Sequence, residues 1–154
     1  MKGAAGVVQT LNDVLVSELT AINQYFLAGK IARHRGYARL GERLNAESIE
    51  EMKHASRLID RILYLEGLPN VQKLEKVRIG GSLVEQLRFD CELERKSVAR
   101  LNEGVTQARK AGDAGTAELF EDLLVGAERH VEWLETQLAL VRDLGEQYWL
   151  AQQL

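Results

Sequence analysis

A Glu-x-x-His motif, Glu51-Met52-Lys53-His54, is the clearest chemical signal in the sequence. If this stretch is helical, residues three apart share a face, so its carboxylate and imidazole converge on one point. Carboxylate oxygens and imidazole nitrogens are ligands of transition metals such as iron. The motif therefore predicts part of a metal site, and a surface ion pair between neighbouring helical turns is the simpler alternative.

Three more ionisable residues, Glu18, Glu94 and His130, interrupt apolar stripes at helical spacing. Burying an unpaired carboxylate is costly, so such groups are paired, protonated or bound to metal. Di-iron carboxylate bundles take one Glu from each of two helices and a Glu-x-x-His from each of the other two. These residues match most of that set. The alternatives are an exposed acid at Glu18 and a hydrogen-bonded core histidine at His130.

The second Glu-x-x-His is incomplete, because the stretch reads Ala127-Glu128-Arg129-His130. Glu128 lies two residues before His130, about 200° around a helix, and should face away from the core. The sequence therefore predicts five ligands of a six-ligand centre, with Ala127 in the position of the missing carboxylate.

Apolar residues recur at spacings of three and four almost throughout, which predicts an all-α protein. The third helix should open at the capping box Ser82-x-x-Glu85 and fade at residues 111–113. Gly67, followed by Pro69, should stop the second helix. The expected helices span about 7–35, 37–66, 82–111 and 116–143, with a short fifth helix in 146–154. A four-helix bundle whose one long connection (67–81) crosses its full length has the ferritin-like topology, here as a single domain over 1–154.

Composition excludes several classes of protein. The formal charge is −3 with no basic block, so a nucleic-acid footprint has no support. No apolar run is long enough for a membrane span, and we expect no signal peptide at the N-terminus. The lone Cys91 rules out a disulfide framework and fits a cytoplasmic protein.

Whole motifs resemble the bacterioferritins, the haem-containing ferritins of bacteria. The similar stretches lie along nearly the whole chain: Met1-Lys2-Gly3, residues 18–27 (ELTAINQYFL), 47–55 (ESIEEMKHA), 61–70 (RILYLEGLPN) and 130–138 (HVEWLETQL). The resemblance implies a hollow cage of two dozen subunits that stores ferric mineral. It places the family's di-iron ligands on Glu18, Glu51, His54, Glu94, position 127 and His130, so that Ala127 replaces a bridging glutamate.

The resemblance also implies haem b at twofold dimer interfaces, held by one methionine from each partner. Met52 is the candidate, because it lies about 100° around the helix from Glu51 and so points to another face. A thioether is a plausible axial ligand of haem iron. The other candidate pocket residues are Leu19, Ile22, Asn23, Phe26 and Ile49. Without the resemblance, a packing methionine would be the better interpretation of Met52.

The first hypothesis for function is an iron-storage subunit that binds haem and has an impaired ferroxidase centre, with iron bound as a pair or singly. It would form a homo- or hetero-oligomeric cage, in the second case beside a ferroxidase-competent subunit, and would take electrons from a donor for iron release. One alternative is a fully active ferroxidase that oxidises Fe(II) to Fe(III) with five ligands. Another is a non-catalytic shell protein that carries haem.

Overall fold

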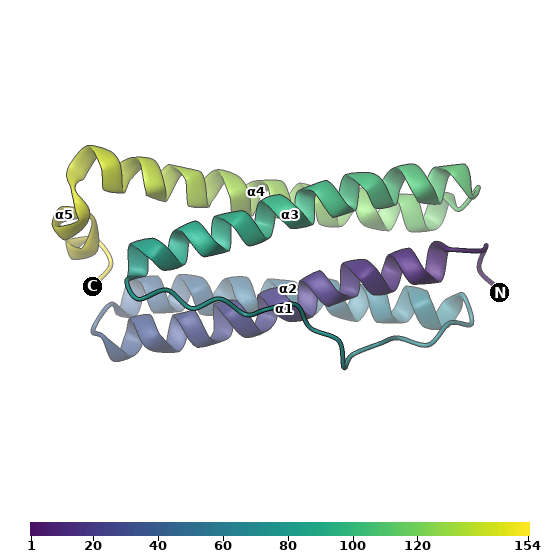
Figure 1. Ribbon diagram of the computed structural model, residues 1–154, viewed down its shortest axis with the longest axis horizontal. Coiled ribbons are helices and arrows are strands. Elements are labelled where there is room, and N and C mark those ends of the chain that lie inside the picture. The colour runs from purple at the N-terminus through teal and green to yellow at the C-terminus, as the bar shows by residue number, and fades with distance from the viewer.

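A computed structural model describes residues 1–154. Its helices are α1 (Val7–His34), α2 (Ala38–Tyr64), α3 (Leu83–Lys110), α4 (Ala114–Leu144) and α5 (Glu146–Ala151). Two antiparallel hairpins, α1–α2 and α3–α4, pack side by side, and α5 lies across one end of the bundle (Figure 1). The predicted four-helix bundle with a short fifth helix is confirmed.

Capping side chains set where the second hairpin begins and turns. Ser82 Oγ accepts a hydrogen bond from the Glu85 amide at 3.1 Å, as the capping box predicts. The Glu85 carboxylate, however, accepts from the Gly81 amide at 2.9 Å, one residue earlier than a standard capping box. The helix α4 begins two residues earlier than expected, because Asp113 caps it by accepting from the Thr116 amide at 3.0 Å.

The C-terminus of α2 differs from the expectation. The helix ends at Tyr64, and the residue with left-handed backbone is Glu66 (φ 61°), not Gly67. Gly67 matters for packing instead, since a Cβ there would lie 2.6 Å from Val8 Cγ1. The glycine therefore lets the departing chain lie directly against α1.

The connection between α2 and α3 runs the length of the bundle beside α1 and α3 (Figure 1). Its backbone amides at Glu75 and Arg78 donate to Thr20 Oγ1 and Gln24 Oε1 of α1, both at 3.0 Å. Arg100 of α3 also donates to the Glu75 carboxylate at 2.7 Å. These bonds seat the predicted crossover on the bundle.

The core consists of two apolar clusters, one toward each end of the bundle. Each long helix passes from one cluster to the other across a polar residue of the predicted centre. On α1, for example, Leu15 belongs to the first cluster and Ala21 to the second, with Glu18 between them. The polar residues thus form a layer between two apolar regions.

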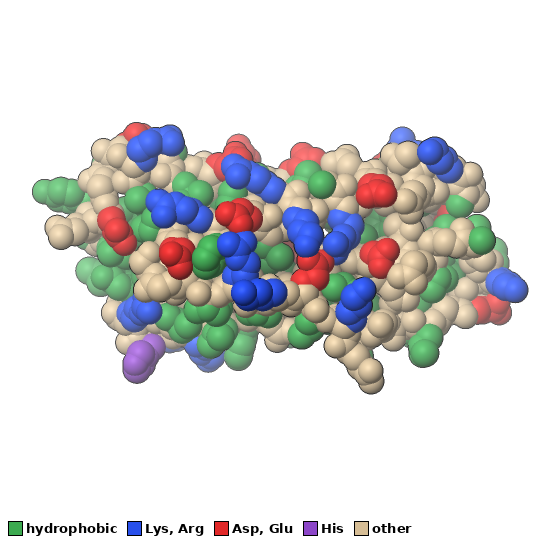
Figure 2. Space-filling view, in the orientation of Figure 1, with side chains coloured by type: hydrophobic (Ala, Val, Ile, Leu, Met, Phe, Trp, Pro, Cys, Tyr) green, Lys and Arg blue, Asp and Glu red, His purple; other side chains and the backbone are tan.

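The surface carries charges of both signs. Figure 2 shows Lys and Arg side chains mixed with Asp and Glu over the face formed by α1, α3 and the crossover. None of the helices combines the length and the apolar character that crossing a membrane requires.

Candidate metal centre

All five predicted ligands meet at the middle of the bundle. Glu18, Glu51, Glu94 and His130 are buried and His54 is half-buried, and together they come from four helices. Their ligand atoms form two groups, Glu18–Glu51–His54 and Glu51–Glu94–His130, each with all atoms within 4.8 Å of one another. Glu51 belongs to both groups, which is the arrangement of a bridging carboxylate.

Each histidine turns its Nδ1 atom toward this layer. His54 Nδ1 lies 3.3 Å from Glu51 Oε2 and 3.7 Å from Glu18 Oε2. His130 Nδ1 lies 2.9 Å from Glu51 Oε1 and 3.0 Å from Glu94 Oε1. The two oxygens of Glu51 therefore face different histidines.

Burial and mutual repulsion shift the titration of these carboxyls. Burial, followed by the charge of Glu51, raises the pKa of Glu18 well above its ordinary value and that of Glu94 to about 7. Burial also acts to raise the pKa of Glu51, but hydrogen bonds from Glu18, His130 and His54 outweigh it and hold this pKa well below the ordinary value. Burial acts to lower the pKa of His130, whereas its carboxylate partners raise it to about 12. Protons thus balance the buried negative charge.

The donor set fits divalent iron. Glu18 Oε2 is buried without any hydrogen-bond partner, which is unusual for a buried carboxylate. A cation between Glu18, Glu51 and His54 would use this oxygen, and the mixed carboxylate and imidazole donors suit iron.

Comparison with known proteins identifies the family. Residues 8–144 match the family described as Ferritin-like domain. The bacterioferritin of Streptomyces coelicolor is 45% identical over 151 residues, which cover 98% of this chain and 90% of that protein. The bacterioferritin of Mycobacterium leprae is 44% identical over 152 residues (99% and 96%), and that of Brucella melitensis is 42% identical over 147 (96% and 91%). The chain belongs to the bacterioferritin family.

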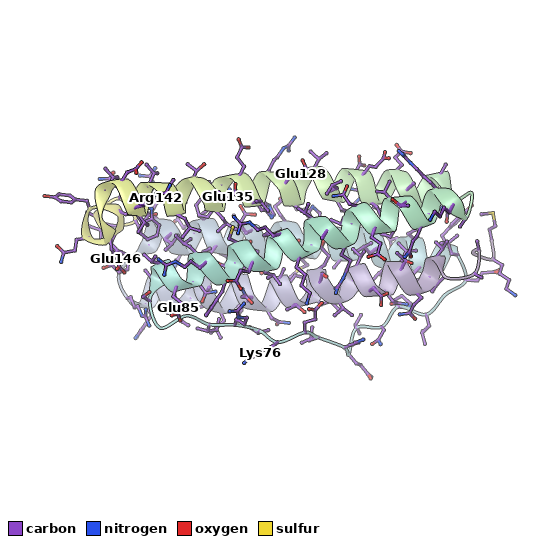
Figure 3. The ribbon with its side chains drawn as sticks, turned by 45° about the horizontal axis from the view of Figure 1, so that its top comes forward. Lys76, Glu85, Glu128, Glu135, Arg142 and Glu146 are labelled. Carbon is purple, nitrogen blue, oxygen red and sulfur yellow. The ribbon has the colours of Figure 1, made fainter.

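Position 127 of this bacterioferritin chain is a buried methyl group. Ala127 packs with the apolar cluster that contains Leu123 and Leu15. Glu128 does not compensate, because it is exposed on the outer side of α4 (Figure 3). The expectation that Glu128 faces away from the core is confirmed.

Two residues that contact the centre were not among the predicted ligands. The Tyr25 hydroxyl donates to Glu94 Oε1 at 2.7 Å. Glu47 is buried, and its Oε2 lies 2.5 Å from His130 Nε2. Glu47 had a detectable signal, since it precedes Glu51 by one helical turn on the same stripe. Tyr25 had none, because an aromatic residue on an apolar stripe is the ordinary core pattern.

The predicted haem residues lie on a different face of the α1–α2 hairpin. Met52 is 56% exposed, Phe26 and Ile49 are about half exposed, and Asn23 is exposed. Leu19 and Ile22 are half-buried between this face and the core. The structure thus brings these six residues to one largely apolar surface, separate from the metal centre.

A cavity of about 520 Å³ leads from the α2–α4 surface to the two histidines. Glu47, Glu50 and Asp122 supply carboxylates to its lining, beside His54 and His130, and Arg43 and Arg129 supply guanidinium groups.

Proposed function

We propose that this chain is the subunit of an iron-storing cage whose metal centre oxidises Fe(II) slowly because Ala127 replaces a ligand. The observation that carries the proposal is the pair of ligand groups that share Glu51 in the middle of the bundle. Similarity over nearly the whole chain to proteins named bacterioferritin supports iron as the metal.

Fe(II) is the substrate of this centre. One ion would meet Glu18, Glu51 and His54, and the other would meet Glu51, Glu94 and His130. Hard carboxylate oxygens stabilise Fe(III) over Fe(II), so they favour loss of an electron to dioxygen or peroxide. Entering iron would displace the protons that now balance the buried carboxylates.

The methyl group at Ala127 contributes neither charge nor ligand atoms. Only Glu51 is left to bridge the two ions, so we expect a pair that binds weakly or unevenly. For rapid oxidation this chain would then depend on a ferroxidase-competent subunit in the same cage. An isolated mixed cage should have a higher initial rate of Fe(II) oxidation than a cage of this chain alone; an unchanged rate would argue against such co-assembly.

Haem b would be held by Met52 at a contact between two copies of the chain. The exposed thioether and its apolar neighbours fit this group, because a second copy related by twofold symmetry would present the same surface and a second thioether. Bound haem would supply one-electron transfer for the release of stored iron. In this role Leu19, Ile22 and Phe26 would exclude water from the haem face.

The haem proposal is tested with purified full-length protein reconstituted with haem. We expect Met52→Leu to lose the visible band of six-coordinate haem, and Met52→His to restore a six-coordinate band at a shifted wavelength. An unchanged band in Met52→Leu would refute Met52 as the ligand.

The iron proposal is tested by soaking crystals in Fe(II) and collecting anomalous data at the iron edge. We expect density between Glu51 and each histidine, with unequal occupancy. Absence of iron at both positions would favour a non-catalytic, haem-carrying shell protein instead.

A further inference from the structure

A second set of contacts lies on the outer side of the His130 ring, away from the ligand groups. Glu47 Oε2 lies 2.5 Å from Nε2 of this ring, an ion-pair contact that lacks the alignment of a hydrogen bond, while Nδ1 faces Glu51 and Glu94 on the other side. The imidazole is therefore held between carboxylates at both of its nitrogens.

Glu47 is itself held in place. Its Oε1 accepts a hydrogen bond from Arg43 Nε at 2.8 Å and lies 2.8 Å from Nη2 of the same guanidinium, and the residue is only 6% exposed. The Arg43 guanidinium in turn lies over the Trp133 ring, with 4.4 Å between its Cζ and the ring centroid. Trp133 follows His130 by three residues and lies on the same face of α4. Arg43 and Glu47 of α2 therefore contact two neighbouring residues of α4, Trp133 and His130.

We propose that Glu47 and Arg43 are positioning residues for His130, which keep its Nδ1 turned toward the metal position shared with Glu51 and Glu94. The inference rests on the proposed function of the centre. A ligand histidine that donates its other N–H to a carboxylate has its tautomer and ring orientation fixed, and its ligand nitrogen becomes more basic.

His54 has no equivalent support. Its only carboxylate contacts are through Nδ1, to Glu51 and Glu18. On its other side the ring lies beside Gly126, where a Cβ would be 3.2 Å from His54 Cε1. The two metal positions therefore differ in the rigidity of their histidines, and the His130 position should fill first when metal is limiting.

The test uses Co(II) as a divalent probe that dioxygen does not readily oxidise in such sites. Crystals of the assembled, metal-free protein are soaked at graded Co(II) concentrations, and anomalous occupancy gives an apparent Kd for each position. Glu47→Gln keeps the shape of the side chain and removes its charge. Glu50→Gln is the matched control, because Glu50 lines the same cavity but contacts neither histidine.

We expect Glu47→Gln to weaken binding at the His130 position by roughly 10- to 100-fold, the usual effect of losing such a partner. The His54 position should stay near its wild-type Kd, and the His130 ring should rotate or lose order in the metal-free crystal. Arg43→Gln should give a smaller loss in the same direction, which keeps the test open if Glu47→Gln does not assemble. Glu50→Gln should leave both occupancies unchanged.

Other outcomes would overturn the inference. Wild-type binding and ring order in Glu47→Gln, or equal losses at both positions, would show that Glu47 does not position His130. Failure of the wild-type protein to bind Co(II) at either position would instead refute the metal centre itself, and the inference with it.

Discussion

Replacing Ala127 with glutamate should restore a missing ligand. The Ala127 methyl is buried at the edge of the apolar cluster next to the centre. Ala127→Glu adds a methylene and a carboxylate there, one turn before His130 on the same face of α4. The fourth helix would then carry the complete Glu-x-x-His that α2 already has.

The metal-free variant should be less stable than the wild type. Its carboxylate would join Glu18, Glu51 and Glu94, and two unit charges about 4 Å apart repel by about 4 kcal/mol at an effective dielectric constant of 20. Overpacking beside the apolar cluster would add roughly 1–3 kcal/mol. Proton uptake by the new carboxyl would relieve part of the repulsion, so we expect a loss of a few kcal/mol.

Bound metal should turn this loss of stability into a gain, because the added carboxylate then faces a cation. The variant's melting temperature should therefore rise more on Co(II) addition than that of the wild type, since ligand that binds only the folded state stabilises it. The initial rate of Fe(II) oxidation should increase at least about tenfold, which corresponds to about 1.4 kcal/mol of barrier.

The assay is stopped-flow absorbance of Fe(III) after anaerobic Fe(II) is mixed with aerated protein at two ions per subunit. Ala127→Gln is the control, because it matches glutamate in shape but carries no charge. The reasoning would be refuted if the wild type already oxidised iron as fast as Ala127→Glu, or if Ala127→Gln gave the same gain.

Two predictions concern the fold itself. Burial raises the pKa of Asp90 to about 6 from 3.8, despite two hydrogen bonds from glutamine side chains. The stabilising contribution of Asp90 is therefore complete below pH about 4. As the pH rises through about 6, this contribution is lost and the free energy of unfolding falls by about 3 kcal/mol. Asp90→Asn should remove this loss. In denaturant unfolding of the metal-free protein, the free energy of unfolding of the variant should therefore rise relative to that of the wild type between about pH 4 and 7. A difference that does not change with pH would contradict the raised pKa of Asp90. Gly67→Ala should lower the free energy of unfolding by about 1–3 kcal/mol, because its Cβ would meet Val8 at 2.6 Å. Gly81→Ala, with no atom within 4 Å of its Cβ, is the control, and equal effects of the two substitutions would refute the packing argument.

Local sequence signals located the start of α3 better than the start of α4. Ser82 caps α3 as the capping box predicts, whereas the cap that Asp113 makes on α4 was not predicted and moves the start of that helix two residues earlier. The end of α2 was less predictable, because the role of Gly67 depends on contact with Val8 in another helix. The local rule treats Gly67 as a helix stop, whereas in the structure its role is to allow close packing against a residue far away in the sequence.

The sequence by itself determined the four helices, the crossover and five candidate ligands, because helical spacing places Glu18, Glu94, His130 and the Glu51–His54 pair on buried stripes. It also shows alanine where a second Glu-x-x-His would have its carboxylate, at Ala127, which a count of acidic residues would hide. Only the tertiary structure decided how the two ring nitrogens of His130 are used. Glu51 and Glu94 face one nitrogen and Glu47 the other, because α2, α3 and α4 meet around the ring at distances that residue spacing along a single helix cannot specify.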